Sequence, residues 1–167
     1  MLLKSLLLLC CLVLIKGAEV PEEEENPAPI LQFLNDDQIA TFLSEIPDAI
    51  KLSPEVTVQS SKARREYEPH TLRWTIGSRQ TGDAVVYSNA QPIQWFDNFS
   101  NLKLIVTYPK TGSGKIVTYV SIELQQSNRL FHAYVFDGGI GERNIELYVQ
   151  AYHTRLFSWD IKIYGKD

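Results

Sequence analysis

Cysteine is scarce in this sequence and is confined to its N-terminus. The chain has 167 residues, and its two cysteines, Cys10 and Cys11, both lie in an apolar block. If that block is removed as a signal peptide, the remaining chain has neither a disulfide nor a thiol nucleophile. A domain without disulfides must be held together by its apolar core. The scarcity excludes a disulfide-stapled scaffold and a cysteine-based active site.

The sequence also lacks an excess of positive charge. It carries 16 lysines and arginines against 20 acidic residues, a net charge of −4. The imbalance lies in residues 19–65, which have 10 acidic and 4 basic side chains, whereas residues 66–167 have 10 of each. Surfaces that bind nucleic acid directly are rich in lysine and arginine. We therefore expect no direct nucleic-acid ligand.

No sequence motif indicates catalysis. The histidines His70, His132 and His153 are far apart and lack the spacing of a zinc site. No serine occupies a nucleophile elbow. The run 138–141 has the glycine content of a dinucleotide loop, and Lys115 follows two glycines, but a strand pattern rather than a helix follows each. We predict no enzyme, no cofactor and no metal; a hydrolase would need histidine and a carboxylate in one pocket.

Residues 1–18 have the pattern of a signal peptide. Lys4 precedes the apolar block 6–15, and Gly17-Ala18 closes it. The alternative, a membrane anchor, needs about 18 apolar residues, and this block is shorter. The pattern predicts a secreted, extracellular protein with no membrane contact after cleavage.

Residues 19–65 form an acidic leader. Residues 19–29 are acidic and proline-rich, which is typical of a linker. Apolar residues from Ile39 to Ile46 then recur at helical spacing, so we expect a short amphipathic helix, capped by Asn35 or Asp36, that ends before Pro47. Such a helix docks on the domain that follows or on another protein. Residues 47–61 are expected to form a loop.

The leader ends at a pair of arginines. Arg64 and Arg65 stand in a polar stretch, and in an exported chain such a pair is a cleavage site for a convertase. Cleavage there would release residues 66–167 from an acidic propeptide. The alternative is a solvated basic patch without processing.

From Leu72 onward, apolar and polar residues alternate as in half-buried strands. Turn residues 109–114 favour a hairpin between two of these strands, and residues 72–76 and 83–87 favour another. Short strands without helical periodicity predict an all-β, antiparallel sandwich or barrel-like domain. The remaining strands are expected at 102–108, 116–124, 130–136, 145–151 and 157–163.

A cluster of glycines separates two of the expected strands. Gly138, Gly139 and Gly141 are too many for a packed strand, so the backbone is expected to turn here, with positive φ.

Two further features bear on the surface of the domain. Asn98-Phe99-Ser100 is an N-glycosylation sequon that we expect in a loop between strands, which would make the protein a glycoprotein. Tyr119, Tyr148, Tyr152 and Tyr164 alternate with the core positions, so they either favour the strand conformation or form a surface for a partner.

Three short segments carry a family resemblance: 76–83 (Ile-Gly-Ser-Arg-Gln-Thr-Gly-Asp), 138–141 (Gly-Gly-Ile-Gly) and 161–165 (Ile-Lys-Ile-Tyr-Gly). Through them, residues 72–167 resemble the insect multiprotein bridging factor two family. It implies a protein without catalytic residues. The family is named after a silkworm transcriptional coactivator that bridges to the general machinery, and many members carry signal peptides and occur in saliva, venom or haemolymph. The acidic leader is an addition to the usual short member.

Two functions are consistent with these features; we predict the first, and the second is the alternative. The first is a secreted, non-enzymatic binding or effector protein of an arthropod secretion that acts through a protein partner. The second is a transcriptional coactivator that bridges transcription factors to the general machinery.

Overall fold

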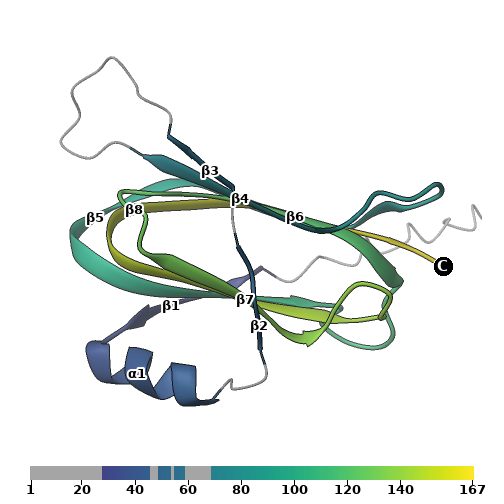
Figure 1. Ribbon diagram of the computed structural model, residues 1–167, viewed down its shortest axis with the longest axis horizontal. Coiled ribbons are helices and arrows are strands. Elements are labelled where there is room, and N and C mark those ends of the chain that lie inside the picture. Colours follow the sequence, from purple (N-terminus) through teal and green to yellow (C-terminus); the bar gives the residue numbers. More distant parts are fainter. Residues whose placement is uncertain (1–27, 46–48, 54, 59–68) are drawn as a thin grey trace, which may run out of the picture.

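The computed structural model describes residues 28–45, 49–53, 55–58 and 69–167 (Figure 1). The predicted signal peptide 1–18, most of the linker and the pair Arg64-Arg65 lie outside the described residues. Within them, the elements in chain order are β1 (Ile30–Leu34), α1 (Asp36–Glu45), β2 (Ile50–Lys51), β3 (Glu55–Val58), β4 (His70–Gly77), β5 (Ala84–Tyr108), β6 (Ile116–Gln126), β7 (Phe131–Gly138) and β8 (Ile145–Lys166).

All described strands belong to one antiparallel sheet that folds over on itself. The order is β1-β5-β8-β6-β4-β3, and β7 pairs with both β8 and β2. The first half of β8 pairs with residues 102–108 of β5 and with β7, whereas its second half pairs with residues 84–94 of β5 and with β6. The two long strands therefore run through two layers (Figure 1). The layer that contains β6, β4 and β3 is called the β6 layer. The layer that contains β7, β1 and β2 is called the β7 layer.

The sheet bends where β5 and β8 lose their regular pairing. The register shifts between Trp95 and Ser100 and again between Ser100 and Leu102. Opposite this irregularity, His153 has a positive φ of 50°. Bulges bend strands and increase their twist, so one sheet can form both layers of a sandwich. The predicted antiparallel sandwich is confirmed.

The core lies between the layers and follows the alternation of the sequence. Inward positions of the β7 layer, such as Leu104 of β5 and Leu147 of β8, are completely buried. Side chains of β4, β6 and the second half of β8, such as the fully buried Ile161, meet them from the β6 layer. The full cluster includes Leu72, Trp74, Val120, Ile122, Leu124, Val149 and Ile163.

The predicted helix is confirmed as α1. Asn35 Oδ1 accepts a hydrogen bond from the Gln38 amide at 2.8 Å, and the Asn35 amide donates to Gln38 Oε1 at 2.9 Å. This reciprocal pair is a capping box, and two acidic residues in the first turn complement the helix dipole. No helix in the described ranges is long and apolar enough to cross a membrane.

Both predicted hairpins are wrong. β4 pairs with β6 and β3, and β5 pairs with β8 and β1, so neither turn joins two paired strands. Residues 109–115 instead connect Tyr108 in the β7 layer with Ile116 in the β6 layer. Turn residues reverse the chain wherever they occur, but they do not decide which strands pair. β8 lies between β5 and β6 and pairs with both, and β4 pairs with the other edge of β6.

Two further expectations are corrected. The strands predicted at 145–151 and 157–163 are one continuous strand, β8, because the bend between them keeps enough pairing to continue the sheet. The loop predicted at 47–61 contains β2 and β3, two short edge strands that pair with β7 and β4. Both are too short for periodicity to reveal.

Candidate functional site

The outer face of the β7 layer carries an aromatic cluster beneath α1. Phe42 of α1 is 4% exposed, and its ring centre lies 5.3 Å from Tyr148 and 6.4 Å from Tyr134. Lys103 Nζ lies 4.1 Å from the centre of the Phe42 ring and 4.4 Å from that of Tyr148. Cation–π contacts strengthen when they are shielded from water, so this lysine helps to hold α1 on the sheet. Phe136 stacks on Tyr148 at 4.7 Å.

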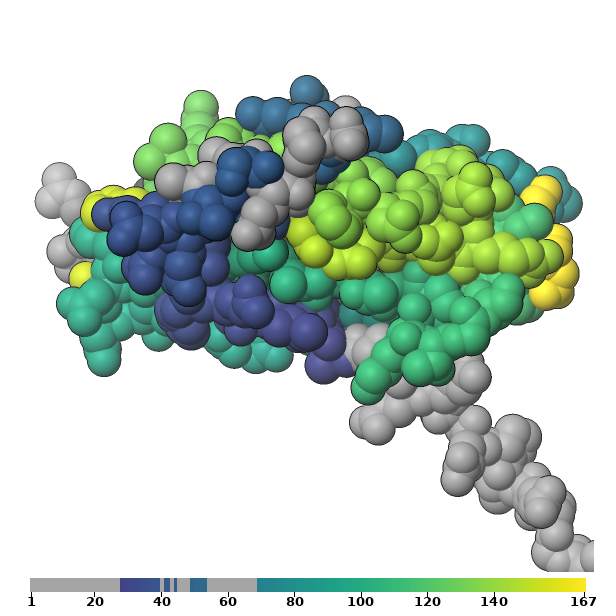
Figure 2. All heavy atoms as spheres, turned by 90° about the horizontal axis from the view of Figure 1, so that it is seen from below, coloured from purple at the N-terminus to yellow at the C-terminus, as the bar shows by residue number. Residues whose placement is uncertain are grey.

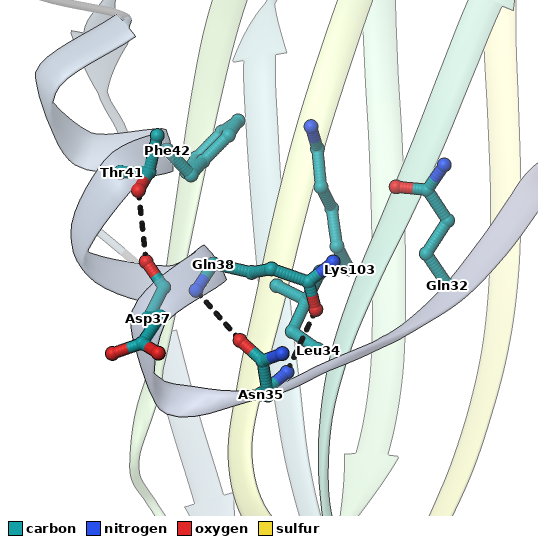
Figure 3. A pocket seen from close by; sticks show the side chains of 8 residues that line it. All are labelled: Gln32, Leu34, Asn35, Asp37, Gln38, Thr41, Phe42 and Lys103. Carbon is teal, nitrogen blue, oxygen red and sulfur yellow. Dashed lines mark hydrogen bonds between the residues drawn. The ribbon is translucent and has the colours of Figure 1, made fainter.

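An open hollow of about 310 Å³ lies beside this cluster, between β1, α1 and β5. In Figure 3, Phe42 and Lys103 approach the same space from α1 and β5. The hollow is at the small end of ligand-binding cavities, and most of its polar groups are neutral amides and a hydroxyl. Its lining therefore favours contact with a peptide over acid–base chemistry. The lining residues are Gln32, Leu34, Asn35, Asp37, Gln38, Thr41, Phe42 and Lys103.

Neutral polar groups continue the outer face toward the bend. Gln150 is fully buried, and its Oε1 accepts a hydrogen bond from the Tyr152 hydroxyl, whereas its Nε2 has no hydrogen-bond partner in the described part of the chain. Burial raises the pKa of Tyr152 to about 12, so that the hydroxyl stays protonated. Burial, together with the charge of Lys51, lowers the pKa of His132, which is therefore neutral at pH 7.

The histidines are not assembled into one site. His70 lies on β4, His132 on β7, and His153 at the bend of β8, where its ring stacks on Phe99 at 4.0 Å. Among the described residues there is no group of three or more histidine, cysteine or acidic side chains that could hold a metal ion.

The three segments that carry the family resemblance meet around the first residues of β6. The amide of Gly141 donates to the carbonyl oxygen of Val117 at 2.8 Å, and the Ser78 amide donates to that of Thr118 at 3.1 Å. A Cβ atom on Gly77 would lie 2.3 Å from the Thr118 oxygen, and one on Gly165 would lie 2.9 Å from the Ile116 oxygen. The glycines allow these backbones to approach each other. The three segments therefore serve the packing of this end of the domain.

Asp83 holds this end together, a role of its side chain that was not predicted from the sequence. Its side chain is 1% exposed and accepts hydrogen bonds from Arg79, the Gln80 amide and the Thr118 hydroxyl. The hydrogen bond from Arg79, followed by that from the Gln80 amide, lowers the pKa of Asp83 to about 2. The Arg79 guanidinium also lies 3.8 Å from the centre of the Tyr164 ring. The i, i+4 spacing of Arg79 and Asp83 was the available signal.

The glycine run forms the turn between β7 and β8. Gly138, Gly139 and Gly141 have φ angles of 63°, 141° and 89°. The Gly139 amide donates to the carbonyl oxygen of Asn144 at 3.0 Å and closes the turn. No helix follows it, because β8 begins at Ile145.

Asn98 lies within β5 and not in a loop between strands, so that part of the prediction is corrected. The residue is exposed and belongs to the segment where β5 and β8 lose register. The absence of regular pairing explains why its sequence resembles a loop. Its glycosylation stays a prediction.

The four tyrosines do not form one surface. Tyr119 and Tyr164 contact each other on the β6 layer, with ring centres 5.6 Å apart, whereas Tyr148 packs under α1 and Tyr152 lies near the bend. All four are half-buried or packed against other side chains. They serve two different faces of the sandwich.

Comparison with known proteins assigns the family. The family model described as "Transcription activator MBF2" matches residues 76–165, more than half of the chain. The chain belongs to the MBF2 family. No curated protein and no solved structure matches it. The MBF2 match runs from the end of β4 almost to the end of β8, and it leaves out β1, α1, β2 and β3. Membership points to protein partners.

The MBF2 assignment contradicts the predicted extracellular location. A family of transcription activators points to a nuclear or intracellular protein. The prediction of secretion rested on the pattern of residues 1–18, in which Lys4 precedes an apolar block that ends at Gly17-Ala18. Such a pattern does not by itself distinguish every short apolar N-terminus from a signal that is used.

Proposed function

We propose that this MBF2-family chain is a non-enzymatic transcriptional coactivator that bridges transcription factors to the general machinery through protein contacts. The single observation that carries the proposal is the family match over residues 76–165. It favours this reading over that of an effector protein of a secretion.

The surface of the domain supports binding through protein contacts. Several large apolar side chains are exposed, including Phe33 at 61% and Trp95 at 52%. Aromatic residues are enriched where proteins bind one another. The hollow beside Phe42 offers amide groups that can pair with the main chain of a peptide.

The charge distribution supports indirect recruitment to DNA. Residues 66–167 carry equal numbers of acidic and basic side chains, so they have no basic surface excess for phosphate contacts. A coactivator of this kind reaches a promoter by binding a DNA-bound protein. The specificity of recruitment would then be that of the bound transcription factor.

A tethered reporter assay tests the proposal. The full chain is fused to a heterologous DNA-binding domain, and transcription from a reporter is compared with that of the DNA-binding domain alone. We expect activation of several-fold or more. Leu104→Asn, which places an amide in the core, should abolish it, and Thr107→Asn, at an exposed position of the same strand, should not.

Two results would contradict the proposal. One is a nuclear, folded fusion protein that does not activate the reporter. The other is equal activation by the Leu104→Asn variant, since activity would then not depend on the folded domain.

A further inference from the structure

Two strands of the leader cover edges of the sheet that lie within the MBF2 match. β1 pairs with the edge of β5 and β2 with that of β7, whereas β3 pairs with residues 70–73 of β4, which precede the match. β1, β2 and β3 themselves lie outside residues 76–165. An open strand edge presents unpaired N–H and C=O groups and readily accepts another strand. The leader therefore occupies edges that the family domain would otherwise offer to a partner.

We propose that the edge of β5 at residues 101–105 is a strand-accepting site for an extended segment of a protein partner, and that β1 with α1 is its built-in competitor. The inference rests on the proposed function, because it names the surface by which the coactivator would bind. β1 and α1 lie on the outside of the domain, next to β5 (Figure 2).

The way β1 is held makes it replaceable. Its five residues pair in full register with residues 101–105, but Ile30 is 57% exposed and Phe33 is 61% exposed. Of its side chains, Leu31 packs against the main core. A strand attached mainly through its backbone can be exchanged for another, because main-chain hydrogen bonds do not depend on sequence.

Phe42 is the main described anchor of α1, the helix that follows β1. Among the described side chains of α1, Phe42 is the one that is buried, between Tyr134, Tyr148 and Lys103. A hydrogen bond of 3.3 Å from Asn101 Nδ2 to Asp36 Oδ1 adds a polar contact at the start of the helix. Removal of the Phe42 ring should therefore loosen both α1 and β1.

The contacts of the leader define the chemistry of the partner. The partner needs an extended segment with an apolar side chain in the place of Leu31 and an aromatic side chain in the place of Phe33. The Phe33 ring lies edge-on to that of Phe96, with ring centres 5.6 Å apart. A helix with an aromatic residue in the place of Phe42 should follow, over the hollow. The segment that the partner inserts is thus an apolar strand that continues into an amphipathic helix.

Binding of a labelled peptide to the full chain tests the proposal. The probe is a synthetic peptide of residues 28–45, followed by fluorescence anisotropy. A tethered segment competes at a millimolar effective concentration, so the wild-type chain should not bind micromolar peptide. The Phe42→Ala chain should bind it at least tenfold more tightly, and Ser44→Ala, at an exposed position of α1 that does not line the hollow, should behave as wild type.

A second variant tests the backbone of the strand. In Gln32→Pro/Phe33→Pro, two successive amides are removed, and since these point to opposite sides of a strand, one ladder bond is lost. This chain should bind the peptide, whereas Gln32→Ala/Phe33→Ala, which keeps both amides, should bind at least tenfold more weakly. A peptide that carries the two prolines should not bind any of the chains.

Hydrogen exchange decides among the outcomes. The proposal is overturned if residues 101–105 become unprotected in the Phe42→Ala chain and the peptide still does not bind. It is also overturned if β1 stays protected in both variants, or if both fail to fold, since the leader would then be an integral part of the sheet. If the Phe42→Ala chain forms a dimer that the peptide cannot dissociate, the occupant of the β5 edge is a second copy of this chain. That result would refute binding of a different protein at this edge.

The reporter assay separates this proposal from the proposed function. Activation without peptide binding would contradict the strand-accepting site alone. Peptide binding without activation would support the site and contradict the coactivator role.

Discussion

Replacing Gly138 by alanine tests why the turn between β7 and β8 needs its glycines. A Cβ atom on Gly138 would lie 2.1 Å from the carbonyl oxygen of Asn144 and 2.7 Å from its carbonyl carbon. On Gly139, a Cβ atom would have nothing within 4 Å. Both positions have positive φ, at 63° and 141°. The two variants therefore share backbone strain, and Gly138→Ala alone adds a collision with the backbone.

The magnitude follows from these two costs. Positive φ costs an alanine about 1–2 kcal/mol at Gly138, and about 1–3 kcal/mol at Gly139, whose φ of 141° lies outside the left-handed α region. The collision at Gly138 forces Asn144 to move, which breaks the 3.0 Å hydrogen bond from the Gly139 amide. Loss of that bond and of the local packing adds about 1–2 kcal/mol. We expect Gly138→Ala to lose about 2–4 kcal/mol of unfolding free energy, and Gly139→Ala about 1–3 kcal/mol.

Urea unfolding followed by tryptophan fluorescence measures the difference. Trp74 and Trp159 are buried in the core, so their emission reports its opening. With a slope typical of a small domain, the midpoints of the two variants should differ by about 0.5–1 M urea. Equal midpoints, or a lower midpoint for Gly139→Ala, would refute the steric account of the turn.

Three further perturbations test the packing and the electrostatics. Because the pKa of Asp83 is lowered from 3.8 to about 2 in the folded state, its stabilising contribution is complete above pH 3.8 and is lost as the pH falls toward 2; the stability difference between wild type and Asp83→Asn should shrink over that range in urea titrations. Leu104→Ala should lower the unfolding free energy by about 2–5 kcal/mol, and the exposed Thr107→Ala by about 0.5 kcal/mol or less, in the same assay. Phe42→Ala should speed hydrogen exchange in α1 and leave β6 protected; equal exchange in both would contradict the separate attachment of the helix.

Local patterns in the sequence predicted the elements of the fold. The alternation at Leu102, Leu104 and Val106 placed these side chains in the core, where they are buried. Capping residues and helical spacing placed α1, because Asn35 satisfies the first amides of the helix within a few residues of sequence. These features depend on near neighbours, so a single sequence reveals them.

Pairing between strands was not predictable in the same way. Turn residues at 109–114 suggested a hairpin, but β8 lies between β5 and β6 and takes up their edges. The alternation predicts two strands, 145–151 and 157–163, in place of the single strand β8, because the polar stretch around His153 interrupts the pattern at the bend. Which edges meet depends on contacts between residues that are far apart along the chain, and these leave no periodic signal.

For the candidate site, too, local features were predictable and contacts between distant residues were not. By itself, the sequence determined an all-β domain, a helix with one apolar face, a glycine turn and the MBF2 resemblance, because each is encoded in local composition and spacing. Only the tertiary structure decided that Phe42 meets Lys103 and Tyr148, that Asp83 reaches Thr118, and that β1 covers the edge of β5. Those contacts join residues brought together when one sheet folds into two layers around a shared core.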